Sequence, residues 1–334
     1  MIKCTVKQDS VNGYDLHRIP GLICTESGKL LAYYECRKTE DDWAAIDIAL
    51  KTSTDGGEIW SSDRVLVEGK GKNVNNPVML ADGADILFMW QEEYHRTFCR
   101  KSFDEGETWG EITEITESLR TKEYPWTVIA CGPGHGTVLK SGRYIVPVWL
   151  CSNLKDPKAH APSLISTIYS DNKGMSWKLG ELIRRKELIN PSETSLAQLT
   201  DGRVMLNIRH MSEQRRRVIA YSDSGVSDWY DLRFEESLPD PICMGSLVAH
   251  EDKVYFFNCN SEDKREKLTL YESCDKGMTW NEIIMVSQAA GYSDIAVSPD
   301  GSKIYIFFEE FHYKPDQELD RSKSQSLMFA IIEV

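Results

Sequence analysis

The chain has 334 residues, of which 41% are hydrophobic, and this is enough to bury a large core in one large domain or two ordinary ones. Its 52 acidic residues outnumber its 39 basic residues, so the net charge is −13 and a nucleic-acid partner is disfavoured. The run Arg215-Arg216-Arg217 is the local exception, and we interpret it as a solvated face of a strand or hairpin.

Membrane and metal signals are missing from the sequence. No uncharged apolar run of about 18 residues occurs, so we expect no membrane span. Residues 1–10 lack the apolar core of a secretion signal, which predicts a cytoplasmic protein, or a secreted or periplasmic one if a leader has been removed. The nine cysteines are scattered without metal-ligand spacing, so we expect buried, reduced thiols and neither a metal nor a cofactor.

Most of the chain reads as short β-strands separated by turns, without a long amphipathic helix pattern. Gly/Asp turn signals at 81–85, 200–203 and 299–303 separate segments in which apolar and polar residues often alternate. In chain order, the clearest strand segments are 47–53, 143–150, 203–210, 217–223, 253–260, 267–273, 303–310 and 326–334. The sequence therefore predicts an all-β fold.

One phrase, approximately Ser-x-Asp-x-Gly-x-Thr-Trp, recurs among these segments. It begins at Ser53, Ser102, Ser170 and Ser273, and a damaged copy contains Asp223, Gly225 and Trp229. Its period of roughly 50 residues is typical of propeller or solenoid repeats. Ser and Asp side chains can bond turn amides, Gly adopts positive φ and Trp can pack between repeats. We therefore interpret the phrase as a scaffold turn and not as a repeated active site.

The repeat length indicates a particular all-β architecture. Four short strands in roughly 50 residues are typical of one blade of a β-propeller. A chain of 334 residues accommodates six such blades, so we predict a single six-bladed β-propeller over residues 1–334. The end segments 2–8 and 327–334 are both strand-like, and their pairing would close the ring and remove exposed strand edges.

Function is expected in residues that do not repeat. Arg18 interrupts the apolar segment 16–22, Arg209 ends a strand, and Arg265 precedes another. Because the inner strands of a propeller converge on one axis, residues far apart in sequence can share one pocket. Three guanidinium groups meeting there would hold a carboxylate through charge-assisted, bidentate hydrogen bonds.

Together with the repeats, several motifs resemble those of the retaining exo-α-sialidases (neuraminidases), over nearly the whole chain. In chain order the matching residues are Arg18-Ile19-Pro20, then Glu35, Arg37 and Asp42, the Gly-Pro-Gly-His-Gly segment 132–136, Glu193 and Arg209, Arg265, and Tyr292. The sequence departs from the family pattern at His17, where Phe or Tyr is usual, and at Ile59 and Asn172 in the repeated phrase. We expect His17 to border the pocket, where it could alter substrate preference.

The resemblance implies a substrate and a clamp. Arg18, Arg209 and Arg265 would bind the carboxylate of a terminal, α-ketosidically linked sialic acid on an oligosaccharide or glycoconjugate. Arg37, Glu35 and Trp43 are further candidates for substrate binding, with Arg37 orienting the catalytic acid or pairing with a neighbouring acid such as Glu35.

The resemblance also implies the catalytic groups. Tyr292 would be the nucleophile, Glu193 the base that takes its proton, and Asp42 the general acid and base. Two successive inversions through a covalent tyrosyl–sugar intermediate would give net retention.

Alternatives remain open at this stage. Asp41 adjoins Asp42 and has the same side chain, and Trp43 and Trp126 can each form either an N-acyl pocket wall or core packing. The same clamp also fits other 2-keto-3-deoxy sugar acids, such as Kdn or Kdo glycosides. A transferase, or a non-catalytic sialoside-binding propeller, would share the scaffold.

Overall fold

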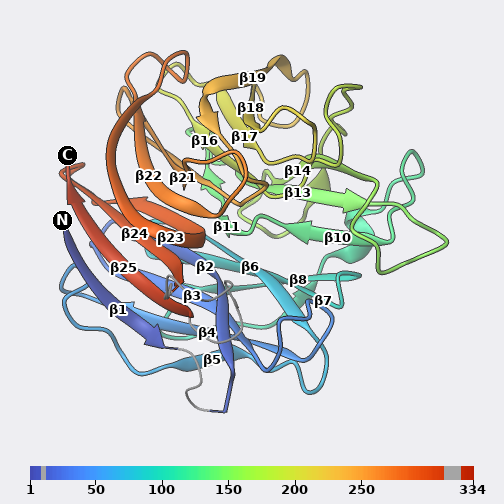
Figure 1. Ribbon diagram of the computed structural model, residues 1–334. Helices are drawn as coiled ribbons and strands as arrows, with labels where there is room; N and C mark the ends of the chain where they lie inside the picture. The colour runs from blue at the N-terminus through green and yellow to red at the C-terminus, as the bar shows by residue number, and fades with distance from the viewer. Residues whose placement is uncertain (9–12, 312–324) are drawn as a thin grey trace, which may run out of the picture.

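A computed structural model describes residues 1–8, 13–311 and 325–334 (Figure 1). These residues form 25 strands and one 3-10 turn, Thr116–Leu119, so the expectation of an all-β fold is confirmed. Within this part of the chain, no helix has the length and apolar character needed to cross a bilayer.

The strands form five hydrogen-bonded sheets. The first contains β2 (Leu16–Cys24), β3 (Leu30–Arg37), β4 (Ile46–Ser53) and β5 (Arg64–Val67). The second contains β11 (Gly134–His135), β6 (Val74–Asp82), β7 (Asp85–Glu92), β8 (Arg96–Ser102) and β9 (Thr113–Glu114). The third contains β10 (Val128–Cys131), β13 (Tyr144–Cys151), β14 (Ser163–Ser170) and β15 (Lys178–Leu179), with β12 (Thr137–Val138) paired to β13.

The fourth and fifth sheets complete the chain. The fourth contains β16 (Thr194–Gln198), β17 (Val204–Ile208), β18 (Arg216–Ser222) and β19 (Tyr230–Pro239). The fifth contains β1 (Ile2–Gln8), β25 (Gln325–Glu333), β24 (Lys303–Phe311), β23 (Asn281–Val297), β22 (Glu266–Ser273), β21 (Lys253–Cys259) and β20 (Ser246–His250). The long strand β23 pairs with β22 over its first half and with β24 over its second, so this sheet joins two groups of strands.

The hydrophobic core is divided into clusters that lie between neighbouring groups of strands. Leu31 of the first sheet and Met79 of the second, for example, belong to one cluster that Trp109 packs against. The tryptophans of the four repeated phrases and of the damaged copy lie in five different clusters: Trp60, Trp109, Trp177, Trp229 and Trp280. The expectation that these tryptophans pack between repeats is therefore borne out.

The four repeated phrases form the same turn. In each, the serine Oγ accepts a hydrogen bond from the glycine N–H at 2.8–2.9 Å. The Asp or Asn Oδ1 accepts another from the N–H four residues later at 2.8–3.0 Å. The glycines adopt φ values between +75° and +93°, a region that L side chains rarely enter. The phrase thus uses its polar side chains to satisfy its own backbone.

The two ends of the chain lie side by side (Figure 1). Strand β1 pairs antiparallel with β25, with Ile2 opposite Ile331, as the strand-like ends predicted. Strands from every sheet also approach one another, because residues of β2, β6, β12, β16, β20 and β23 line a common cavity of about 410 Å³.

Two of these inner strands bend where a proline follows a residue with positive φ. The ladder of β2 is irregular between Arg18 and Gly21, and Ile19 has φ +56°. The ladder of β6 is irregular between Asn75 and Val78, and Asn76 has φ +49°. Such bulges turn side chains and free N–H groups out of the ladder. Both bulges contribute to the site described below.

Candidate active site

Arg18 of β2, Arg209 directly after β17 and Arg265 directly before β22 surround the side chain of Tyr292. The Arg209 Nη1 atom lies 3.4 Å from the Tyr292 hydroxyl oxygen. The guanidinium carbons of Arg18 and Arg265 lie 5.5 Å and 5.0 Å from the centre of the Tyr292 ring. The convergence predicted for Arg18, Arg209 and Arg265 is therefore present. Three cations around one phenol form a site that favours an anionic ligand.

Tyr292 is paired with a carboxylate. Its hydroxyl donates a hydrogen bond to Glu193 Oε1 at 2.6 Å. The other oxygen of Glu193 forms an ion pair with Arg209 and accepts a hydrogen bond from Ser192 Oγ at 2.9 Å. Only 12% of the Glu193 side chain is exposed. The arrangement gives the phenol a proton acceptor within hydrogen-bonding distance.

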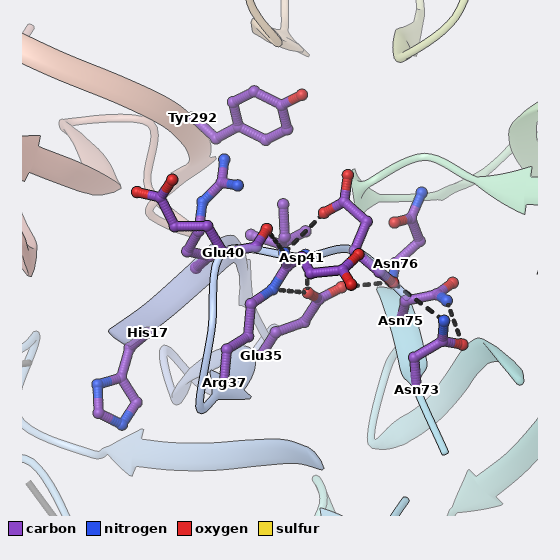
Figure 2. Close-up of polar contacts among 12 residues, drawn as sticks. His17, Glu35, Arg37, Glu40, Asp41, Asn73, Asn75, Asn76 and Tyr292 are labelled. Atoms are coloured by element: carbon purple, nitrogen blue, oxygen red, sulfur yellow. Dashed lines mark hydrogen bonds and ion pairs between the residues drawn. The ribbon is translucent and has the colours of Figure 1, made fainter. Parts of the chain in front are cut away.

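Asp42 lies beside a buried ion pair. Arg37 Nη1 donates to Asp42 Oδ1 at 2.6 Å, while Arg37 Nε donates to Glu35 Oε2 at 2.7 Å. Glu35 Oε1 accepts the N–H of Asn76 at 2.7 Å, at the bulge of β6. Asn73 Nδ2 donates to the backbone carbonyl of Asp42 at 3.0 Å. Figure 2 shows Glu35 and Arg37 side by side, with Asn73 and Asn76 on one flank and Tyr292 across the site.

Glu35, Arg37 and Asp42 differ in solvent exposure, and this difference indicates which of them a ligand can reach. The side chains of Glu35 and Arg37 are 0% and 1% exposed, whereas that of Asp42 is 42% exposed. Burial tends to raise the pKa of Asp42, but the Arg37 guanidinium outweighs it, and the pKa lies below its ordinary value. Burial raises the pKa of Glu35, and Arg37 only partly offsets this effect. Glu35 and Arg37 thus support Asp42 from behind, and Asp42 is the member of the group that can meet a ligand.

The choice between the two adjacent aspartates is decided by their contacts. Asp41 Oδ1 accepts the backbone N–H of Trp43 at 2.9 Å and so closes a local turn. Asp42 contacts Arg37, whose charge lowers the pKa of Asp42. The charge of Arg18, which belongs to the arginine cluster, also lowers this pKa. The geometry therefore favours Asp42.

The two candidate tryptophans lie in different surroundings. Trp43 is partly buried and packs against Tyr94, with ring centres 5.1 Å apart, and against His160 at 6.0 Å. Trp126 is 3% exposed, donates from Nε1 to the Leu119 carbonyl at 3.1 Å and belongs to a core cluster. Trp43 is next to Asp42 in an aromatic group, whereas Trp126 is a core residue.

His17 does not border the pocket as the sequence led us to expect. Its side chain is fully buried and packs edge-on against Tyr34 and Tyr14, at 5.7 Å and 6.1 Å. Figure 2 shows its ring directed away from the site. Successive residues of a strand point to opposite faces, so Arg18 reaches the site and His17 reaches the core.

Glu309 is a buried acid beside the site that was not predicted from the sequence. Glu309 of β24 is 0% exposed, and its Oε1 accepts hydrogen bonds from Arg18 Nε and the Ile19 N–H, both at 3.2 Å. Its Oε2 accepts the Tyr292 N–H at 3.0 Å. Glu309 therefore fixes both an arginine of the cluster and the backbone of the tyrosine. The sequence signal was ambiguous, because Glu309 and Glu310 together interrupt an apolar strand and their adjacency does not say which of the two points inward.

The all-β fold and the repeated turn place this chain in a class of proteins built from repeats. A family model described as BNR repeat-like domain matches residues 28–306, and the chain belongs to that family. Within it, the chain is similar to sialidases. A sialidase of Bacteroides fragilis is 27% identical over 304 residues, which cover 79% of this chain and 54% of the relative, so the chain spans about half of that protein.

Solved structures with similar folds carry the same name. The Hadza microbial sialidase Hz136 superposes with a TM-score of 0.85 at 22% identity, covering 100% of this chain and 68% of the other. A Trypanosoma rangeli sialidase gives a TM-score of 0.73 at 18% identity, covering 97% and 56% of the two chains.

Proposed function

We propose that this protein is an exo-α-sialidase that hydrolyses terminal sialic acids with retention of configuration. The observation that carries the proposal is the Tyr292 hydroxyl, hydrogen-bonded to Glu193 at 2.6 Å and enclosed by Arg18, Arg209 and Arg265. The substrates would be sialylated oligosaccharides or glycoconjugates.

The arginine cluster suits a sugar whose anomeric carbon bears a carboxylate. Guanidinium groups bind carboxylates through paired, charge-assisted hydrogen bonds, and three of them would fix the ring orientation. The same carboxylate explains a tyrosine nucleophile. An Asp or Glu nucleophile at about 3 Å from it would be repelled by several kcal/mol at intermediate dielectric, whereas a neutral phenol avoids this repulsion.

The proton transfers follow from the contacts. Glu193 accepts the phenolic proton as the Tyr292 oxygen attacks the anomeric carbon, because a neutral phenol is a weak nucleophile without a base. Asp42 donates a proton to the departing glycosidic oxygen. It then removes a proton from the water that hydrolyses the tyrosyl–sugar intermediate.

We also infer that the strand groups are six blades of a propeller formed by residues 1–334. The core clusters between neighbouring groups, the β23 strand shared by two groups and the β1–β25 pairing all fit a closed ring. In such a ring the inner strands β2 and β23 would deliver Arg18 and Tyr292 to one end of the axis, where Arg209, which follows β17, meets them.

Two structures of a related sialidase support a covalent mechanism and leave the sugar open. One T. rangeli sialidase structure is described as a covalent intermediate with difluorosialic acid, and another as a complex with the difluoro derivative of KDN. Hydrolysis of Kdn or Kdo glycosides is therefore the second candidate, since the clamp recognises only the shared carboxylate. A non-catalytic sialoside-binding protein is less consistent with Asp42, Glu193 and Tyr292 all lying around the arginine cluster.

Replacing the nucleophile tests the proposal. Tyr292→Phe is expected to lower kcat for a fluorogenic sialoside by at least about 100-fold, because it removes the attacking oxygen. Tyr305→Phe, in a strand at 5% exposure, is the matched control and should retain activity. NMR of the product should show the α anomer first. Near wild-type turnover by Tyr292→Phe, or initial release of the β anomer, contradicts the mechanism.

A separate comparison identifies the preferred sugar. It measures the rates of hydrolysis of sialic acid, Kdn and Kdo glycosides by the wild-type protein.

A further inference from the structure

Arg217 is fully buried, although it belongs to the arginine run that we interpreted as solvated. It is 0% exposed and is among the largest completely buried side chains of the described residues. Its neighbour Arg216 is 23% exposed and pairs with Glu262 at 2.7 Å. Strand alternation explains the difference, because β18 directs one side chain outward and the next inward. The solvated interpretation is therefore wrong for Arg217.

Every nitrogen of the Arg217 guanidinium has an acceptor. Nε donates to Asn207 Oδ1 at 2.6 Å, and Nη2 donates to the Asn207 carbonyl at 3.1 Å. Nη1 donates to the Cys243 carbonyl at 2.8 Å and lies 3.4 Å from Asp240 Oδ2. Burying a charge costs free energy unless the charge is paired and hydrogen-bonded. Replacing a buried ion pair with apolar side chains of similar volume often leaves the stability of the fold unchanged or increases it. Stability alone is thus a weak reason for an arginine here.

The partners of Arg217 belong to the two segments that carry Arg209 and support Arg265. Asn207 lies two residues before Arg209 at the end of β17. The turn from Asp240 to Cys243 contains Ile242, whose carbonyl accepts a hydrogen bond from Arg265 Nη2 at 3.4 Å. Arg217 therefore links the backbone segment that carries Arg209 to the turn that bonds Arg265.

The turn that supports Arg265 is strained. Ile242 has φ +58°, which is a genuine outlier for a β-branched residue and persists only when its surroundings enforce it. Those surroundings are Arg217, which holds the Cys243 carbonyl, and Asp240 Oδ1, which accepts the Cys243 N–H at 3.1 Å. Without Arg217, the turn loses its link to β17.

The charge of Arg217 is also coupled to the site. Burial lowers the pKa of Arg217, Asp240 opposes this effect, and the nearby Arg209 lowers the pKa further. The Arg217 and Arg209 guanidinium groups thus repel each other through the protein interior, where screening is weak.

We propose that Arg217 is a positioning residue that sets the spacing between Arg209 and Arg265 and so determines the affinity of the arginine cluster for a substrate carboxylate. This inference rests on the proposed function. It assigns Arg217 no contact with the substrate and no part in proton transfer.

The test compares one ligand with and without its negative charge. The 2,3-unsaturated sialic acid and its methyl ester are titrated calorimetrically against wild type, Arg217→Lys, and the double variant Arg217→Met with Asp240→Asn. The double variant removes both members of the buried ion pair, so that neither charge is left unpaired. Arg216→Met is the matched control on the same strand, and thermal unfolding confirms that each variant is folded.

The expected result is a selective loss. Both Arg217 variants should bind the acid at least about tenfold more weakly, with the ester unchanged within about twofold, and Arg216→Met should match wild type. Arg217→Lys should be less impaired than the double variant, because it retains the charge but not the planar set of donors. Equal losses for acid and ester, or no loss, overturn the inference. A wild type that does not prefer the acid overturns the proposed function instead.

Discussion

Asp42 and Glu35 are two carboxylates that share one arginine, yet the protein shifts their pKa values in opposite directions. Arg37 holds the pKa of Asp42 below its ordinary value, whereas burial raises the pKa of Glu35. As a general acid, Asp42 must be protonated when the glycosidic bond breaks. The fraction of free protein with Asp42 protonated falls as pH rises through this lowered pKa. We therefore expect kcat/KM to be largest at acidic pH and to decline toward neutrality.

Changing Glu35 to Gln tests this electrostatic link. The Asp42 charge raises the pKa of Glu35, and repulsion is mutual, so removing the Glu35 charge should lower the pKa of Asp42 further. The decline of kcat/KM in Glu35→Gln should then move to lower pH, by up to about one pH unit. Gln keeps an oxygen for the Asn76 N–H, so the fold should persist. Glu123→Gln, at an exposed acid, is the control, and a decline that stays in place or moves to higher pH contradicts the link.

Some site residues could be identified from the sequence and others could not, and the two groups differ in the residues next to them in the chain. Arg18 and Arg209 were found because a lone charge interrupts or ends an apolar strand. Glu309 and Arg217 each lie beside a residue of the same charge, Glu310 and Arg216, and only one of each pair points inward. Alternation guarantees that the two differ but does not say which is buried, because both faces of these strands pack against neighbours.

At the scale of elements, the repeated turn was readable from sequence because its hydrogen bonds are local. Each phrase satisfies its own N–H groups within four residues, so no tertiary information is required. What the phrase packs against is a long-range fact. A Cβ on Gly277 would lie 2.7 Å from the Met205 side chain of another sheet, and one on Gly106 would lie 2.7 Å from Leu31. The turns thus join adjacent sheets as well as strands.

Two glycines with nearly equal φ separate backbone strain from packing. Gly277 has φ +85° and a Cβ there would meet Met205, whereas Gly28 has φ +87° and a Cβ there would have no neighbour within 4 Å. Gly28→Ala should lower the free energy of unfolding by about 1–2 kcal/mol through strain alone. Gly277→Ala should cost about 1–3 kcal/mol more, because Met205 must move. Denaturant titrations give both values, and equal losses would show that the turn does not depend on its contact with the neighbouring sheet.

At the scale of the whole molecule, the sequence predicted the pairing of the two ends but not the sharing of β23. The ends were recognisable because each is a single strand-like segment. Strand β23 runs through 17 residues and changes partner midway, from β22 to β24. Gly291 marks an irregularity at this point, but it does not reveal the new partner, because the partner of a strand is fixed by tertiary packing. Tyr292 lies in the second half of this strand, so its position depends on the sheet that the chain ends complete.

Removing β1 tests whether end pairing supports the site. Deleting residues 1–8 removes the ladder to β25, the buried Val6 side chain and the ion pair of Lys7 with Asp63. The melting temperature should fall by about 5–10 °C, with transient association through the uncovered edge of β25. Calorimetry and light scattering measure both effects. The control is Ile2→Ser, which alters a 68% exposed side chain but keeps the backbone ladder and should behave as wild type. If the truncated chain unfolds at the wild-type temperature and scatters light as the wild type does, β1 does not stabilise the sheet that holds Tyr292, and closure through the chain ends is refuted.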